Sequence, residues 1–204
     1  MNDEKIRLQF HRKRLRRQHE DSETVVVDEL GLKHGRCRAD IAVINGHFVG
    51  YEIKSDKDSL RRLPEQINVY SAVFDRASVI VGEKHACAVK SLIPGWWGLI
   101  LTTQGPRGGV TFTVERKASL NRSVDPFSVA QLLWRDEVAG VLEMLGAEKK
   151  TLRAPRKVLY HCLASEIDIS ELRRQVRMCL KARTGWRYPE PLSPSVGLSR
   201  PCAK

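Results

Sequence analysis

Residues 39–54, ADIAVINGHFVGYEIK, contain two apolar segments joined by Asn45-Gly46, a pair that is typical of β-hairpin turns. Asp40 lies in the first segment, and Glu52 and Lys54 lie in the second. Ionised groups in otherwise apolar strands are costly unless a partner compensates their charge. A divalent metal ion bound by the two carboxylates would provide that compensation and would also support chemistry. This hairpin therefore decides both the expected fold and the expected site.

The length of the hairpin turn decides whether the two acids can meet. Side chains alternate along a strand, so a two-residue turn at Asn45-Gly46 would place Asp40 on the face opposite Glu52. A three-residue turn over residues 44–46, with Gly46 in the left-handed region, would return Asp40 to the face of Glu52. A shared metal ion therefore requires the three-residue turn or an equivalent bulge.

The composition bounds the class of protein. The chain has 204 residues and is 42% hydrophobic, which is ordinary for a globular protein with one medium domain or a domain and a small second unit. No apolar run approaches the roughly 20 residues needed to cross a bilayer, and residues 1–5 lack the apolar core of a secretory signal. Five widely spaced cysteines without a CxxC pair favour a reducing, cytoplasmic location over a disulfide framework or a zinc site.

The chain carries a formal net charge of +11. A positive field of this size favours a polyanionic partner, with nucleic acid ahead of an anionic membrane surface. Arginines of the first predicted helix and of the second strand are the candidate phosphate contacts, although an ordinary solvated face is the alternative. These candidates are Arg12, Arg14, Arg16, Arg17, Arg36 and Arg38.

The periodicity of apolar residues predicts a mixed α/β chain. Three antiparallel strands, a crossover helix and a parallel fourth strand are expected in the first half, and amphipathic helices follow after residue 125. The strands are predicted over residues 24–30, 36–44, 47–54, 77–82, 97–103 and 110–116, and the helices over residues 3–19, 60–74, 84–92, 126–147, 156–164 and 172–182.

The residue types in the hairpin suit one kind of metal chemistry. Asp40 and Glu52 supply hard oxygen ligands, and the backbone carbonyl of Ile53 is a plausible third, a set that suits Mg²⁺. Lys54 can orient an attacking water or stabilise negative charge on phosphorus in the transition state. The alternative is a buried ion pair between an acid and Lys54 that has only a structural role.

The hairpin, together with Gln66 and Tyr70 on the following helix, resembles the PD-(D/E)xK nuclease superfamily over about residues 20–82. The similarity is closest to small bacterial members that resemble restriction endonucleases and RecB-type DNA-repair nucleases. It implies a restriction-endonuclease-like mixed β-sheet flanked by helices, with Mg²⁺, or Mn²⁺ as a substitute, as cofactor. It also implies hydrolysis of DNA phosphodiester bonds to give a 5′-phosphate.

The resemblance implies roles for individual residues. Asp40, Glu52 and Lys54 match the metal-binding and catalytic positions, although Ala39 stands where the family name has proline. Gln66 and Tyr70 match a Q-x-x-x-Y element that some members carry beside the site, and Gln66 is expected to reach the site. Tyr70 fits a packing role equally well. Glu29 could be an additional acid, with an ordinary edge acid as the favoured alternative.

Three segments are expected: a PD-(D/E)xK nuclease-like domain over residues 1–118, a small helical domain over 125–188 and a disordered tail over 189–204. The expected function is a metal-dependent DNA endonuclease, and the alternative is a DNA-binding or recruitment module that keeps the scaffold without turnover. DNA is the expected partner, with RNA left open and no membrane. A homodimer is also open, since cutting both strands usually needs two sites.

Overall fold

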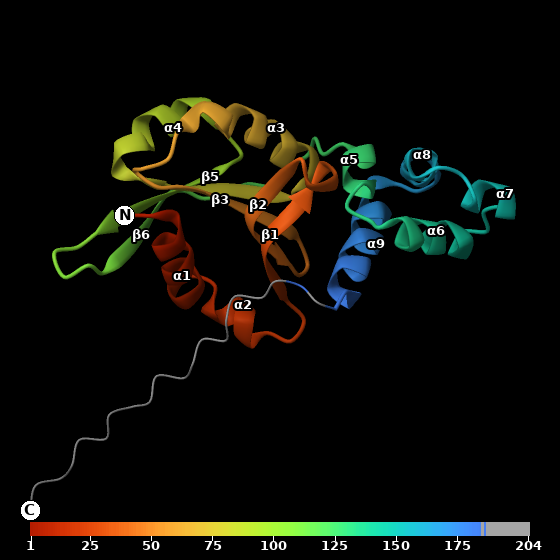
Figure 1. Cartoon of the computed structure of the whole chain (residues 1–204), viewed down its shortest axis with the longest axis horizontal. Helices are drawn as coiled ribbons and strands as arrows, with labels where there is room; N and C mark the ends of the chain where they lie inside the picture. The colour runs from red at the N-terminus through yellow and green to blue at the C-terminus, as the bar shows by residue number, and fades with distance from the viewer. Residues whose placement is uncertain (185, 187–204) are drawn as a thin grey trace, which may run out of the picture.

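The computed structural model describes residues 1–184 and 186, which form an α/β fold with one six-stranded mixed sheet flanked by helices (Figure 1). The strands follow the chain in the order β1-β2-β3-β4-β5-β6. They are β1 (Val25–Leu32), β2 (Cys37–Ile44), β3 (Phe48–Lys54), β4 (Arg76–Gly82), β5 (Gly98–Gln104) and β6 (Val110–Arg116). The α-helices are α1 (Asp3–Lys13), α2 (Arg16–Glu20), α3 (Leu63–Val73), α4 (Ala86–Leu92), α5 (Pro126–Ala130), α6 (Arg135–Met144), α7 (Lys149–Leu152), α8 (Arg156–Glu166) and α9 (Ile169–Ala182), and the 3-10 helices are η1 (Lys33–Gly35), η2 (Leu60–Arg62) and η3 (Glu83–His85).

The turn between β2 and β3 has three residues, as the metal hypothesis requires. Ile44 pairs with Phe48, so the turn comprises residues 45–47. The predicted position, residues 44–46, is wrong by one residue, and the positive-φ glycines of the described chain are Gly35, Gly108 and Gly146 rather than Gly46. The side chain of Asn45 accepts a hydrogen bond of 2.9 Å from the N–H of His47 and closes the turn without a left-handed residue.

The predicted crossover is confirmed. Strands β1, β2 and β3 are antiparallel, and β3 pairs in parallel with β4 after the chain has passed through α3. Helix α3 begins after a short 3-10 turn and carries Pro64 in its first turn. Proline is tolerated there because the first N–H groups of a helix have no partner within the helix.

Helices cover both faces of the sheet (Figure 1). Helices α3 and α4 lie on one face, and α1 lies on the other. On the α1 face, Ile6 and Phe10 pack against strand residues such as Ile41, Ile53 and Ile80, all at most 3% exposed. The sheet is therefore buried on both sides in its centre, which explains the nearly continuous apolar runs of β2 and β4.

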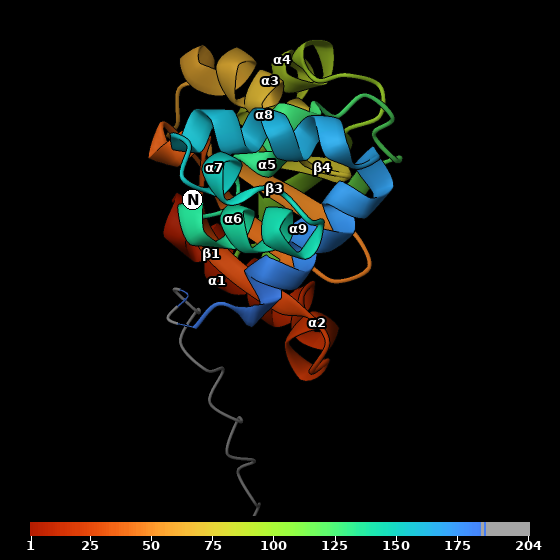
Figure 2. The ribbon, with the colours of Figure 1, turned by 90° about the vertical axis from the view of Figure 1, so that its right-hand side faces the viewer.

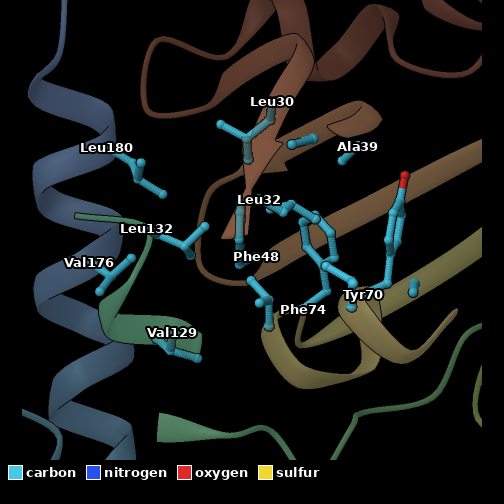
Figure 3. Packing of buried hydrophobic residues seen from close by; sticks show 14 of the residues in the cluster. Leu30, Leu32, Ala39, Phe48, Tyr70, Phe74, Val129, Leu132, Val176 and Leu180 are labelled. Atoms are coloured by element: carbon cyan, nitrogen blue, oxygen red, sulfur yellow. The ribbon is translucent and has the colours of Figure 1, made fainter. Parts of the chain in front are cut away.

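The C-terminal helices pack on the β1–β2 end of the sheet, as Figures 1 and 2 show. Val176 and Leu180 of α9 belong to the same buried cluster as Leu32 and Phe48 of the sheet (Figure 3). Arg173 of α9 also forms a 3.0 Å ion pair with buried Asp75, which precedes β4. The predicted division at residues 118–125 stays a prediction, and the tail predicted over 189–204 lies outside the described residues.

Two predicted helices are broken in the structure. The helix predicted over residues 3–19 ends at Lys13, and α2 begins at Arg16. The spacing of the apolar residues explains the break. Phe10 and Leu15 are five positions apart, so they cannot lie on the same face of one straight helix. The break allows Leu15, 1% exposed, to enter the core.

The prediction of one helix over residues 126–147 is also wrong. The segment forms two helices, α5 and α6, with an irregular stretch between them. Trp134 has extended backbone geometry and starts α6 anew, with Glu137 accepting a 2.7 Å hydrogen bond from its N–H. The short helix α7 was not expected. None of the described helices combines the length and apolar character needed to span a membrane.

A small side chain is required at Gly50, where β3 passes beneath α3. A Cβ atom at Gly50 would lie 2.6–2.8 Å from three ring atoms of Phe74. Phe74 is fully buried and packs on Phe48 and Tyr70, so it has no room to move. We expect Gly50→Ala to lower the free energy of unfolding by about 1–3 kcal/mol, the usual cost of overpacking, in a urea titration.

Gly46→Ala is the matched control, since no atom lies within 4 Å of a Cβ built at that exposed turn position. It should leave the urea midpoint within experimental error of the wild type. Equal stabilities for the two variants would contradict the close packing of β3 against Phe74.

Candidate functional site

A buried carboxylate forms the centre of the site. Glu52 lies on β3, is 0% exposed and faces α3. Its Oε1 accepts hydrogen bonds from Lys54 Nζ, at 2.5 Å, and from Gln66 Nε2, while its Oε2 accepts a 2.6 Å bond from the Tyr70 hydroxyl. Three donors therefore stabilise a charge that could not otherwise be buried.

Helix α3 supplies two of these donors. Gln66 and Tyr70 are four residues apart and share the helix face that lies over β3. The Tyr70 ring also packs on Phe74 and Trp97, with centroids 4.9 and 5.5 Å away. Burial and the nearby negative charges of Glu52 and Asp40 raise the pKa of Tyr70, so its hydroxyl stays protonated and can donate. Tyr70 thus serves packing and hydrogen bonding together.

Asp40 meets this cluster from the neighbouring strand. The pairing of β2 with β3 ends at Ile41 and Tyr51, and Asp40 lies just beyond that last pair. Asp40 Oδ2 accepts a 2.6 Å hydrogen bond from the N–H of Ile53, and the Asp40 N–H donates to the Tyr70 hydroxyl at 3.2 Å. The two predicted acids are therefore neighbours on adjacent strands and both contact the Tyr70 hydroxyl, but the Asp40 carboxylate turns to Ile53 and Arg7 while the Glu52 carboxylate turns to α3.

The pair of carboxylates is electrostatically strained. Burial, followed by the negative charge of Glu52, raises the pKa of Asp40 to about 8, although the Ile53 N–H and Arg7 oppose the shift. Two carboxylates that share a low-dielectric site resist simultaneous ionisation. A cation between them would relieve this repulsion.

Arg7 is a member of the site that the sequence did not reveal. Its guanidinium donates to the backbone oxygen of Asp40 at 2.7 Å and lies 3.3 Å from the Asp40 carboxylate. It also pairs with Asp3 at 3.1 Å and with Glu29 at 2.7 Å. Burial opposes the charged form of Arg7, but the three acids outweigh it and raise its pKa. The sequence feature that could have indicated this role is the position of Arg7 between Ile6 and Phe10, which places it beside the buried stripe of α1.

Glu29 of β1 lies at the level of Asp40 of β2, between the pairs that join Asp28 to Ile41 and Leu30 to Ala39. Its backbone φ of 54° is unusual for a non-glycine residue and interrupts the regular strand there. The Glu29 carboxylate binds Arg7 and also Arg38, at 3.2 Å. Glu29 is thus linked to the predicted acids through Arg7.

The donor set fits a hard divalent cation. A carboxylate offers about four acceptor positions, of which Glu52 uses three and Asp40 two in the contacts described above. The Oε1 atom of Gln66 is buried without a hydrogen-bond partner and could accept from an ordered water. Among the described residues, no group of three His, Cys, Asp or Glu side chains is arranged to hold a metal ion. A third protein ligand beside Asp40 and Glu52 would therefore have to come from the backbone, as predicted for the Ile53 carbonyl.

The predicted phosphate contacts fall in three places, one of which is Arg38 on β2, whose side chain pairs with Glu29 at 3.2 Å. Arg14, Arg16 and Arg17 line a basic hollow of about 460 Å³ on α1 and α2, and Arg12 is exposed nearby on α1. This helix pair lies on the face of the sheet away from α3 and Glu52. Arg36 lies instead beside the C-terminal helices. The structure therefore separates the predicted arginines rather than joining them into one surface.

The fold and this cluster define an α/β protein with a buried acid–lysine site between β2, β3 and α3. The chain belongs to the family described as Bacteriophage P4 protein cII, whose model matches residues 3–188 and so includes the sheet and the C-terminal helices. It is 25% identical over 162 residues to Protein cII of Enterobacteria phage P4, an alignment that covers 79% of this chain and 60% of that relative. No solved structure shows significant similarity to the chain.

The repulsion between the two acids makes a prediction about stability. Asp40 binds a proton more tightly in the folded state than its ordinary pKa of 3.8 implies, so its contribution to folding is lost as pH rises from about 4 to about 8. Asp40→Asn keeps an oxygen acceptor for the Ile53 N–H and removes the charge. We expect it to gain stability over the wild type across this range, by at most about 1.4 kcal/mol per pH unit, with no further gain above pH 8.

Thermal or urea unfolding at several pH values between 5 and 9 measures this difference. Asp136→Asn, which changes a carboxylate whose side chain is 97% exposed, is the control and should show a flat difference from the wild type. A flat difference for Asp40→Asn as well would show that Asp40 ionises without hindrance.

Proposed function

We propose that this protein is a Mg²⁺-dependent nuclease that hydrolyses phosphodiester bonds in DNA. The observation that carries the proposal is that Asp40 and Glu52, on adjacent strands, both contact the Tyr70 hydroxyl, with the ammonium of Lys54 bound to Glu52. Paired carboxylates beside an amine suit phosphoryl chemistry, because they offer both a cation site and a donor for phosphate oxygens. The PD-(D/E)xK resemblance of the same residues supports the proposal.

In this proposal the hairpin residues have separate roles in metal binding and in phosphate binding. Asp40, Glu52 and the Ile53 carbonyl would hold Mg²⁺, or Mn²⁺ in its place. Such an ion supplies neutralisation of phosphate charge and lowers the pKa of water. Lys54 can donate to a phosphate oxygen in the transition state.

The residues of α3 and α1 would complete the site. The unpartnered Oε1 of Gln66 can accept a hydrogen bond from the attacking water and hold that water in line. Tyr70 fixes the orientation of the Glu52 carboxylate, and Arg7 fixes that of Asp40. Neither residue needs to touch the substrate for this role.

A second candidate function is a DNA-binding or recruitment module without turnover. It is favoured by one specific observation: Lys54, Gln66 and Tyr70 already saturate most of Glu52, and Arg7 contacts Asp40. In that case the cluster is a buried polar network that fixes the hairpin against α3. A cytoplasmic location, RNA as substrate and a homodimer stay further proposals.

Plasmid nicking with purified protein tests the two candidates. Asp40→Asn and Lys54→Met should each reduce nicking in Mg²⁺ by at least about 100-fold, because each removes transition-state stabilisation that the other residues cannot replace. Lys57→Met, at an exposed position three residues along, is the matched control and should retain wild-type activity.

Circular dichroism and unfolding curves would confirm that the variants are folded. Nicking by Asp40→Asn at the wild-type rate would remove the assigned site. Wild-type protein that binds DNA but cleaves none in Mg²⁺ or Mn²⁺ would establish the module instead of the nuclease.

A further inference from the structure

A second basic region lies between the β1–β2 connection and the C-terminal helices. It is a cleft of about 800 Å³, with η1 on one side and α5 and α8 on the other. These segments are far apart in the sequence, and the packing of the C-terminal helices on the β1–β2 end of the sheet brings them together (Figures 1 and 2). The lining residues are Lys33, His34, Arg36, Phe127, Ser128, Gln131, Arg156, Lys157 and Tyr160.

The charge of the cleft has one sign. Lys33 and Arg36 approach from η1, Arg156 and Lys157 approach from the first turn of α8, and all four are exposed. No acidic residue is among the lining residues, and none of the four cations forms an ion pair with another described residue. The amino end of α8 adds the positive end of a helix dipole. Four unneutralised cations that converge from two sides are a site for an anion with several charges.

The cleft also presents a flat ring. The exposed imidazole of His34 stacks on Tyr160, with centroids 5.6 Å apart and planes 23° apart. Tyr160 is fixed in turn by a 2.8 Å hydrogen bond from its hydroxyl to the Leu133 carbonyl. Partial burial and the positive charges of Arg156 and Arg36 lower the pKa of His34, which favours its neutral form at pH 7. One face of the imidazole is packed, and the ring can offer the other to an unpaired base.

The backbone that holds His34 is unusual. Lys33, His34 and Gly35 have φ values of 47°, 57° and 84°, three successive residues in the left-handed region. For Lys33 and His34 this conformation costs free energy that an ordinary turn would avoid. Strain of this kind persists where the surrounding structure holds a side chain in a required place, here the imidazole over Tyr160.

We propose that this cleft binds a single nucleic-acid strand, with Lys33, Arg36, Arg156 and Lys157 on its phosphates and a base stacked on His34. Phosphates can pair with the four cations, and an unpaired base can stack on the flat imidazole ring. A single strand therefore matches both features of the cleft. This inference rests on the proposed function, since it names where the substrate strand continues beyond Asp40 and Glu52.

The distance from the cleft to the acids is compatible with one strand. Arg36 directly precedes β2, and Asp40 lies four residues further along it. At about 3.3 Å per strand residue, this separation is roughly 13 Å. A single strand of a few nucleotides spans that length.

Binding measured in EDTA tests the cleft without cleavage. The probe is a fluorescein-labelled single-stranded DNA 20-mer, and the readout is anisotropy over a series of salt concentrations. The double variant Arg36→Gln/Arg156→Gln should bind at least about tenfold more weakly, and its salt slope should fall by about 1.4, the value for two lost phosphate contacts on a single strand. Lys149→Gln/Lys150→Gln removes the same charge from exposed positions on α7 and should keep the wild-type slope.

His34→Ala tests the stacked base. Stacking is not ionic, so this variant should weaken single-stranded binding several-fold at an unchanged salt slope, and it should leave binding of a duplex 20-mer unchanged. Equal weakening by the cleft variant and the α7 control would overturn the proposal. Binding of a mononucleotide as tight as that of the 20-mer would also overturn it, because the cleft would then be a nucleotide site.

The proposal and the nuclease assignment fail separately. Normal binding by the cleft variant, with nicking still lost in Asp40→Asn, would remove the cleft and leave the nuclease in place. Weakened binding by the cleft variant, in a protein that never nicks DNA, would remove the nuclease and leave the cleft.

Discussion

The structure of the site depends on keeping one carboxylate charged in the core. Glu52 is fully buried, and Lys54, Gln66 and Tyr70 together offset the cost of removing it from water. Two of these donors come from α3, so the helix must sit over β3 at one height and rotation. The same requirement keeps Gly50 free of a side chain, since Phe74 of the α3 segment lies directly above it.

Asp40 extends this network to the other side of the sheet. Its N–H reaches Tyr70 above the sheet, while its carboxylate and backbone oxygen reach Arg7 below it. Arg7 then joins Asp40 to Glu29, whose left-handed backbone interrupts β1 at the same level. Polar contacts thus pass through a sheet that is otherwise apolar on both faces. Such an arrangement costs stability and is typical of sites kept for function.

Much of this architecture was predictable from local patterns. The Asn45-Gly46 signal and the alternation of side chains required a three-residue turn if the acids were to share a face. The four-residue spacing of Gln66 and Tyr70 predicted that both lie on one helix face, while a packing role for Tyr70 stayed equally open. The exact turn was missed because Asn45 closes it through its own side chain. Arg7 was missed because its partners are far away in sequence, and the basic cleft was missed because α8 packs against η1 only in the folded chain. Local periodicity carries no information about such contacts.

Diffraction from crystals soaked in Mn²⁺ tests the central claim most directly, because the anomalous signal locates the ion without an activity assay. If the two acids form a metal site, an anomalous peak will lie about 2.0–2.5 Å from one oxygen each of Asp40 and Glu52. The measurement uses saturating Mn²⁺ and a pH above 8. The claim is contradicted if Lys54 stays bound to Glu52 in every molecule and no anomalous peak lies between the two carboxylates.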